Sequence, residues 1–194
     1  MGVQHAGFAL LCVLFLWLVH IVNFFLKYRL NYLGIYPRHI FGLPGILFSP
    51  FLHGNFEHLL LNSIPAFFLI DLVSIYGMFI LITLTIYIIL ASGLLIWLFG
   101  RPAIHVGASG VMLGYWGFLL LSSYHNGSAM AIILALICLY YLGSMALSLL
   151  PLEKGASWEA HVFGFASGVS YVYLLPYLPV DRINAFFPAD WTMS

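Results

Sequence analysis

Long runs of hydrophobic residues, separated by short polar breaks, occupy most of the chain. A bilayer core of about 30 Å is crossed by a helix of roughly 20 apolar residues, and six runs reach or approach that length. They are residues 7–26, 58–76, 78–99, 109–123, 129–150 and 161–178. The runs are continuously apolar and do not alternate with polar positions, so they exclude the strands of a membrane β-barrel. The pattern predicts an all-α membrane protein with a single domain, residues 1–194, built as a six-transmembrane-helix bundle.

The connection after the first run, residues 27–56, is apolar but cannot be one spanning helix. Proline inside a helix removes a hydrogen bond and clashes with the preceding turn, and prolines and glycines interrupt this segment repeatedly. They are Gly34, Pro37, Gly42, Pro44, Gly45 and Pro50. An ordinary surface loop would expose too many apolar side chains to water. We therefore expect a membrane-embedded amphipathic hairpin that lies partly in the interface, with tyrosines and arginines at headgroup level.

The fourth run is short for a span. Its fifteen residues, at about 1.5 Å each, reach about 22 Å, which is less than the thickness of the bilayer core. We therefore expect its first residue, Ser109, to lie below the membrane surface, with residues 101–108 dipping in to meet it. Irregular backbone at that depth has to be surrounded by protein or by a water-filled cavity. This is a first indication of a site.

Composition narrows the possible partners. Hydrophobic residues make up 63% of the chain and charged residues 6%, with a mean hydropathy of +1.07, whereas soluble domains carry about 25% charged residues. The natural surroundings are therefore a lipid bilayer. Six Lys and Arg balance six Asp and Glu without any basic run, which argues against nucleic acid as a partner. Cys12 and Cys138 lie in apolar runs without Cys-x-x-Cys spacing, so we expect buried thiols rather than a disulfide or a metal site.

Polar residues gather at the N-terminal ends of runs two, four and six. Alternate spans point in the same direction, so these three ends lie on one side of the membrane. His58 and Asn62 are four residues apart and share one face of a helix. Ser109 lies in the sequence GASG, and His161 begins the sixth run. Polar groups that are far apart in sequence are therefore expected at one depth, where intramembrane ionisable residues are functional candidates.

Small residues predict close contact between runs four and six. Run four carries glycines four and three residues apart, and run six carries two glycines four residues apart; such faces let two membrane helices approach closely. This approach would bring the His161 ring within hydrogen-bond reach of the Ser109 hydroxyl, and a serine hydroxyl becomes a strong nucleophile only beside a base. The backbone N–H of Ser109, near a helix start, is available to an oxyanion. The glycines are Gly110, Gly114 and Gly117 in run four, and Gly164 and Gly168 in run six.

Together these residues resemble the rhomboid family of intramembrane serine proteases. Three motifs of the family are found in this chain. They are H-x-x-x-x-H-x-x-x-N at His53, His58 and Asn62, G-x-S-G at residues 107–110, and H-x-x-G-x-x-x-G at His161, Gly164 and Gly168. Their order and their placement on runs two, four and six also match, and residues 27–56 look like the family's embedded first loop. The resemblance covers essentially all six runs.

The resemblance implies an enzyme that hydrolyses peptide bonds of transmembrane protein substrates near the membrane surface, without metal or other cofactor. Ser109 would be the nucleophile and His161 the general base, in a dyad without a third acid. The His58 and Asn62 side chains and the Ser109 backbone N–H would hold the oxyanion. Supporting positions would be His53, Gly107, Gly110, Gly164 and Gly168. The resemblance also implies a multi-pass protein of the bacterial inner membrane.

Two features depart from the family pattern. Many members carry an aromatic residue four positions after the serine, stacked on the catalytic histidine, whereas this chain has Leu113. The distribution of cations also conflicts with the family orientation, because the loops after runs one, three and five are the basic ones and basic loops usually face the cytoplasm. We follow the family, which places the first loop and the site outside. The basic residues are Lys27, Arg29, Arg38, Arg101 and Lys154, against Arg182 on the other side.

Alternative functions remain open at this stage. A catalytically inactive rhomboid-like binder of transmembrane helices would usually lack the serine or the histidine, and both are present. A metal-binding membrane protein could use His53, Glu57, His58 and His161, but HGNFEH is not H-E-x-x-H. A transporter with inverted repeats would show matched broken helices in its two halves. Four other histidines are interpreted as interfacial or packing residues: His20, His39, His105 and His125. The natural substrate and the oligomeric state are not predicted.

Overall fold

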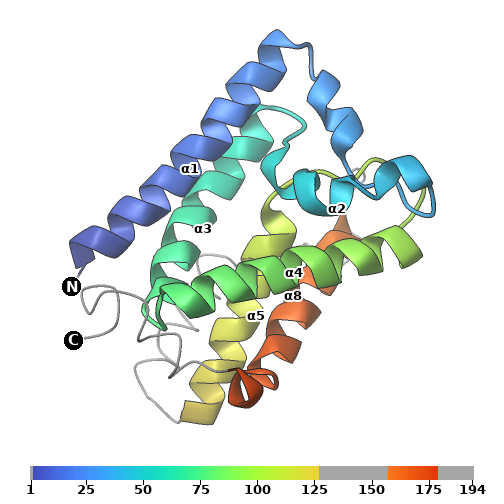
Figure 1. Ribbon diagram of the computed structural model, residues 1–194. Helices are drawn as coiled ribbons and strands as arrows, with labels where there is room; N and C mark the ends of the chain where they lie inside the picture. Colours follow the sequence, from blue (N-terminus) through green and yellow to red (C-terminus); the bar gives the residue numbers. More distant parts are fainter. Residues whose placement is uncertain (1, 127–156, 179–194) are drawn as a thin grey trace.

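A computed structural model describes residues 2–126 and 157–178 of the chain, and every regular element in these ranges is helical (Figure 1). The all-α prediction is therefore confirmed for the described residues. The predicted fifth run, residues 129–150, lies outside them. The long helices are α1 Gly2–Phe25, α3 Phe56–Ser74, α4 Met78–Phe99, α5 Ser109–Asn126 and α8 Trp158–Val172.

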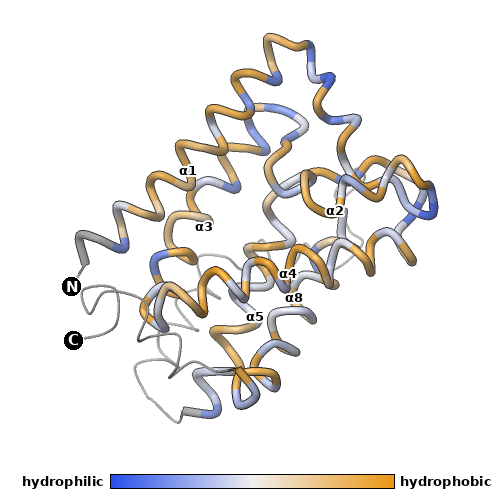
Figure 2. The backbone as a smooth tube through the Cα atoms, in the orientation of Figure 1, coloured by the Kyte–Doolittle hydropathy of each residue, from blue (hydrophilic) through white to orange (hydrophobic). Residues whose placement is uncertain are grey.

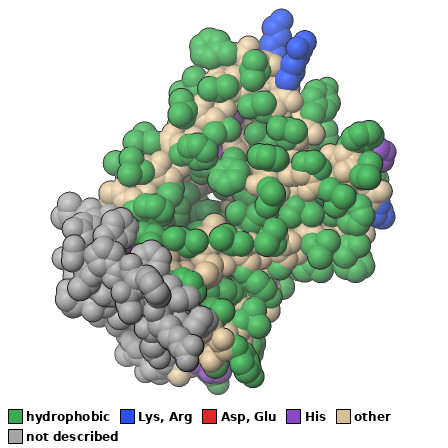
Figure 3. Space-filling model, in the orientation of Figure 1, with side chains coloured by type: hydrophobic (Ala, Val, Ile, Leu, Met, Phe, Trp, Pro, Cys, Tyr) green, Lys and Arg blue, Asp and Glu red, His purple; other side chains and the backbone are tan. Residues whose placement is uncertain are grey.

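Three of the described helices, α1, α3 and α4, are long and apolar enough to cross a membrane. Hydrophobic residues run along most of α1 and α4 (Figure 2). In the coloured part of Figure 3, hydrophobic side chains dominate the surface, and Lys and Arg lie at its edges. Large apolar side chains such as Leu11, Leu61 and Ile86 are more than half exposed. A surface of this kind is suited to lipid rather than water.

The helix ends follow local chemistry. α3 begins after Asn55, whose side-chain oxygen accepts a hydrogen bond of 2.7 Å from the His58 backbone N–H, as an N-cap does. α5 continues past the predicted end through residues 124–126, and its 18 residues span about 27 Å. This length is still less than the bilayer core of about 30 Å. α8 begins three residues before His161 and ends at Val172, and Pro176 follows in the short 3₁₀ helix η4 Leu175–Tyr177.

The segment between α1 and α3 forms a series of short helical turns. These are η1 Arg29–Leu33, η2 Ile40–Gly42, α2 Gly45–Phe48 and η3 Ser49–Phe51. Backbone hydrogen bonds fasten the segment to the C-terminal end of α4 and to the α4–α5 connection. Ile35 and His105 exchange two bonds of 3.1 and 2.9 Å, and Arg38 N–H donates to the Trp97 carbonyl at 2.8 Å. The segment is thus held by contacts with residues about 60 positions later in the sequence.

Helices α5 and α8 lie side by side, and α4 crosses them (Figure 1). The α5–α8 contact is made by glycines: a Cβ built on Gly164 would overlap the Gly110 carbonyl oxygen. α4 is joined to both helices by hydroxyl pairs. These are Thr85–Tyr115 at 2.6 Å, Thr83–Tyr171 at 2.5 Å and Tyr87–Ser170 at 3.0 Å. The tight glycine packing brings the N-terminal ends of α5 and α8 together.

Candidate active site

Ser109 and His161 meet at the N-terminal ends of α5 and α8. The His161 Nε2 atom lies 2.8 Å from the Ser109 Oγ atom, and the two residues are 9% and 8% exposed. Ser109 is the first residue of its helix, and His161 lies in the first turn of the other. A serine hydroxyl that donates to an unprotonated imidazole nitrogen has the geometry required for activation by a general base.

Gly107 lies between the Ser109 hydroxyl and the His58 ring. Its φ is +131°, and a Cβ built on it would lie 2.9 Å from His58 Nε2 and 3.7 Å from Ser109 Oγ. A larger residue would therefore be strained in its backbone and would collide with the imidazole. The Gly107 N–H donates to the Ser49 carbonyl at 2.9 Å, which fixes this approach to the segment before α3. The structure thus brings His58, Gly107 and Ser109 together.

Asn62 follows His58 by about one turn of α3. Its side chain is 4% exposed, and its Nδ2 atom has no hydrogen-bond partner among the described residues. A buried donor without a partner is unfavourable in the resting protein. Such a donor is available to a negative charge that develops only during a reaction.

His53 lies in the connection before α3 and is completely buried. Its ring contacts those of His58 and His20, with ring centroids 5.2 and 6.3 Å away, and its carbonyl accepts from Asn31 Nδ2 at 3.3 Å. Burial, and then the neighbouring His58 and His20, lower the pKa of His53 to about 3, although the Phe51 backbone acts in the opposite direction. A neutral His53 ring therefore packs behind His58.

His20 and His105, which were predicted to be packing or interfacial residues, are both buried and make defined contacts. His20 is 1% exposed, with its ring centroid 4.6 Å from that of Phe56. His105, 3% exposed, bonds through Nδ1 to Ser157 Oγ at 2.5 Å and through Nε2 to the Arg101 carbonyl at 3.0 Å. His105 is therefore held by hydrogen bonds at both ring nitrogens and is more than a packing residue. The only sequence signal for such a role was its position four residues before Ser109.

Glu159 does not serve as a third acid through its described contacts. It is 4% exposed, and its Oε1 atom lies 3.2 Å from Arg101 Nε and accepts from the Arg101 backbone N–H at 3.3 Å. Because Glu159 lies two residues before His161, it was predicted to lie on a different face of the helix from the histidine.

Leu113, at the position where an aromatic residue is common in the family, is 1% exposed and belongs to the hydrophobic core.

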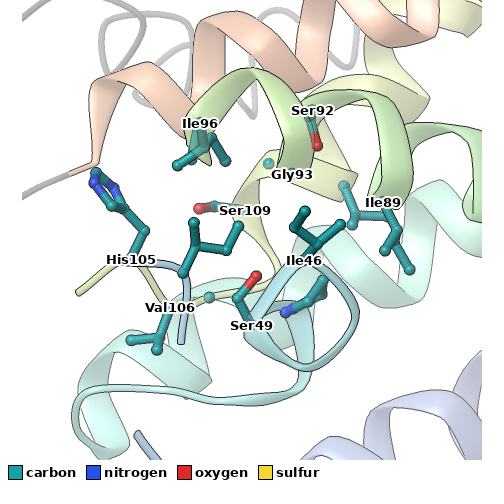
Figure 4. Close-up of a pocket in the computed structure, with 15 residues that line it drawn as sticks. Ile46, Ser49, Ile89, Ser92, Gly93, Ile96, His105, Val106 and Ser109 are labelled. Carbon is teal, nitrogen blue, oxygen red and sulfur yellow. The ribbon is translucent and has the colours of Figure 1, made fainter. Parts of the chain in front are cut away.

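A small cavity of about 20 Å³ adjoins Ser109 (Figure 4). Its polar lining includes Ser49, Ser92, His105 and Ser109, and its apolar lining includes Ile96. A cavity needs about 10–15 Å³ to hold one water molecule, which also needs polar partners. The space beside Ser109 therefore suits a single water.

The described residues contain no group of three or more His, Cys, Asp or Glu placed to hold a metal ion. The metal-binding alternative thus has no ligand set in this part of the chain. Cys12 is a free, half-buried thiol, and Cys138 lies outside the described residues.

Comparisons with known proteins identify the family of the chain. The model of the Rhomboid domain matches residues 37–178. An uncharacterized protein of Mycobacterium tuberculosis is 34% identical over 172 residues, which cover 84% of this chain and 72% of the relative. A counterpart in Mycobacterium bovis has the same identity and coverage. An uncharacterized protein of Mycobacterium leprae is 32% identical over 169 residues, 82% of this chain and 67% of that protein. The family match contains every motif position described above, and the chain belongs to the rhomboid family.

Proposed function

We propose that this protein is an intramembrane serine endopeptidase that hydrolyses transmembrane protein substrates near the membrane surface. The rhomboid family, to which the chain belongs, consists generally of such proteases. The observation that carries the proposal is the 2.8 Å contact between Ser109 Oγ and His161 Nε2 at two buried helix ends. In the proposed reaction Ser109 is the nucleophile and His161 the general base.

The proposed mechanism follows from these positions. His161 Nε2 takes the hydroxyl proton while Ser109 Oγ bonds to the scissile carbonyl carbon, which gives a tetrahedral oxyanion. The Ser109 backbone N–H and the side chains of His58 and Asn62 donate to that oxyanion. His161 then returns the proton to the leaving amine as the C–N bond breaks. In the second half, His161 takes a proton from water, the resulting hydroxide attacks the acyl carbon, and Ser109 leaves with its proton restored.

The glycines and His53 have supporting roles in this proposal. Gly107 leaves room for the His58 ring beside the nucleophile, and Gly110 and Gly164 permit the helix contact that brings serine and histidine together. Gly168 continues this contact along α8. His53 packs against His58. Neither metal nor other cofactor takes part.

For the whole chain we propose one domain, residues 1–194, with six spans and residues 27–56 embedded in the outer part of the bilayer. The protein would be a multi-pass component of a bacterial inner membrane. The site would open away from the cytoplasm, as the family orientation implies.

A fluorophosphonate probe tests the assignment, because it reacts with an activated serine. The full chain in detergent micelles should form an adduct on Ser109 that mass spectrometry locates. Ser109→Ala and His161→Ala should abolish the adduct, and a chelator should leave it unchanged. Ser122→Ala removes a buried hydroxyl elsewhere on α5 and is the control. A folded protein with unlabelled Ser109 would contradict the proposal and would favour an inactive binder of transmembrane helices.

A further inference from the structure

Two bridges join the segment before Ser109 to the segment that begins α8. The first is the contact of Glu159 with Arg101: Oε1 lies 3.2 Å from the guanidinium Nε and 3.3 Å from the backbone N. Glu159 is 4% exposed, whereas the Arg101 side chain is 41% exposed. A carboxylate buried in this way is stabilised by charge-assisted hydrogen bonds.

The second bridge passes through His105. The Arg101 carbonyl oxygen can only accept, so the hydrogen of the neutral His105 ring lies on Nε2. The Nδ1 atom then accepts from the Ser157 hydroxyl, 2.5 Å away. The pKa of His105 is lowered, chiefly by burial and also by the Arg101 charge, although the Arg101 carbonyl and Glu159 act in the opposite direction. A lowered pKa agrees with a neutral ring. His105 also exchanges two backbone bonds with Ile35.

Ser157 is used in an unusual way. It occupies the N-cap position of α8, where a serine hydroxyl normally accepts from a backbone N–H of the first turn, but it makes no such bond. The hydroxyl contacts His105 instead, while the Ser157 carbonyl accepts from Ala160 and His161 N–H at 3.0 and 3.3 Å. In place of a stabilising side-chain cap, the Ser157 hydroxyl makes a bond to the segment that precedes Ser109.

The glycine contact between α5 and α8 explains why such bridges are needed. Side chains that interdigitate fix how far one helix lies along another. They do so farther from the site, where Phe165 packs against Trp116 and Gly117, but the facing positions Gly110, Gly114, Gly164 and Gly168 have no side chains. Near the helix starts the glycine contact therefore sets the distance between the helices, and other contacts have to fix their relative position along the axis there. At the site this position sets the distance between Ser109 Oγ and His161 Nε2.

We propose that Arg101, His105, Ser157 and Glu159 are positioning residues, which hold the start of α5 in register with the start of α8 and so keep Ser109 and His161 in reactive alignment. The inference rests on the proposed function of that pair. A displacement of about 1 Å between reacting groups can slow a reaction about 100-fold. Loss of either bridge should therefore slow the reaction of Ser109 without preventing the fold.

The test compares two serine deletions on the same helix. Ser157→Ala removes the bond to His105, and Ser170→Ala removes the bond to Tyr87 near the other end of α8. For each variant in micelles, the maximal inactivation rate and the half-saturating concentration of the fluorophosphonate are measured, together with thermal unfolding. Ser157→Ala should lower the maximal rate about 10- to 100-fold at an unchanged half-saturating concentration. Ser170→Ala should leave that rate unchanged, and Ser157→Thr, which keeps the hydroxyl, should restore it.

Glu159→Ala, which removes the oxygen that accepts from Arg101, tests the other bridge independently and should give the same kinetic pattern, so the test does not depend on one variant being folded. Equal maximal rates for Ser157→Ala, Glu159→Ala and Ser170→Ala would overturn the positioning role while leaving the proposed function intact. Absence of labelling on Ser109 in the unmodified protein would overturn the proposed function, and the positioning role with it.

Discussion

Gly168 of α8 lies against the carbonyl oxygen of Gly114 in α5, with no room for a Cβ between them. About one turn earlier, Gly164 is placed in the same way against Gly110. The two helices therefore meet backbone to backbone over at least one turn. This contact leads directly to the helix ends that carry Ser109 and His161.

Gly168→Ala should separate these helices. The added methyl group would overlap the Gly114 carbonyl oxygen, and overpacking of this kind costs about 1–3 kcal/mol in the free energy of unfolding. Unfolding in mixed micelles should show this loss, and the fluorophosphonate should label Ser109 more slowly. Gly7→Ala on α1, where a Cβ has no neighbour within 4 Å, is the matched control. Equal stability of the two variants would refute the tight contact.

Asn62→Ala should affect rate far more than stability. The Asn62 Nδ2 atom has no partner among the described residues, so its removal breaks no described hydrogen bond at that atom. Loss of one oxyanion donor slows acyl transfer about 10²- to 10³-fold, and we expect that reduction in the labelling rate of Ser109. Leu61→Ala changes the adjacent residue, which is 64% exposed, and should leave the rate unchanged. If the two variants reacted equally fast, Asn62 would not be an oxyanion donor.

The folded protein should lose stability in acid because of His53. Its pKa is about 3 in the folded chain, against the ordinary value of 6.5. Below pH 6.5 the unfolded chain therefore binds a proton that the folded chain does not bind until about pH 3. As the pH falls through that window, the contribution of His53 should lower the free energy of unfolding by about 1.4 kcal/mol per pH unit. His53→Phe should reduce the slope, measured by chemical unfolding at several pH values, whereas His39→Phe, at an exposed histidine, should not.

The orientation in the membrane can be tested with two exposed tyrosines. Tyr32 in η1 and Tyr124 near the end of α5 are each 77% exposed, and they lie toward opposite ends of the bundle. In intact bacterial cells, with both native cysteines replaced, an impermeant maleimide should label Tyr32→Cys and reach Tyr124→Cys only after lysis. The reverse result would show that the basic loops face the cytoplasm, as the positive-inside count suggests.

Regular features of the fold were predictable from the sequence where local chemistry determines them. The helix predicted over residues 78–99 has the observed bounds, because Gly77 and Gly100 flank an unbroken apolar run. Asn55 is a residue type that favours the N-cap position, and its side chain caps α3. The approach of Ser109 to His161 follows from the glycine spacing and the alternating direction of the helices. Their catalytic roles remain proposals.

Other features depend on contacts that have no local signature. The polar residues at the end of α5 continue the helix although the apolar pattern has ended. The bond between His105 and Ser157 joins positions 52 residues apart, and two irregular segments must first adopt their conformations before it can form. Glu159 was expected to face away from His161, but nothing in the sequence identified Arg101 as its partner. Pairings between side chains so far apart in the sequence become visible only in the folded structure.

The anchoring of the segment between α1 and α3 has a consequence for biosynthesis. Its backbone bonds run to Trp97, His105 and Gly107, and none of these residues has been synthesised when the segment emerges from the ribosome. Because chains are made and begin to fold from the N-terminus, the newly made segment must wait without its permanent partners until α4 and the residues before α5 have been made. A ribosome that stalls after α3 would therefore leave this segment unanchored.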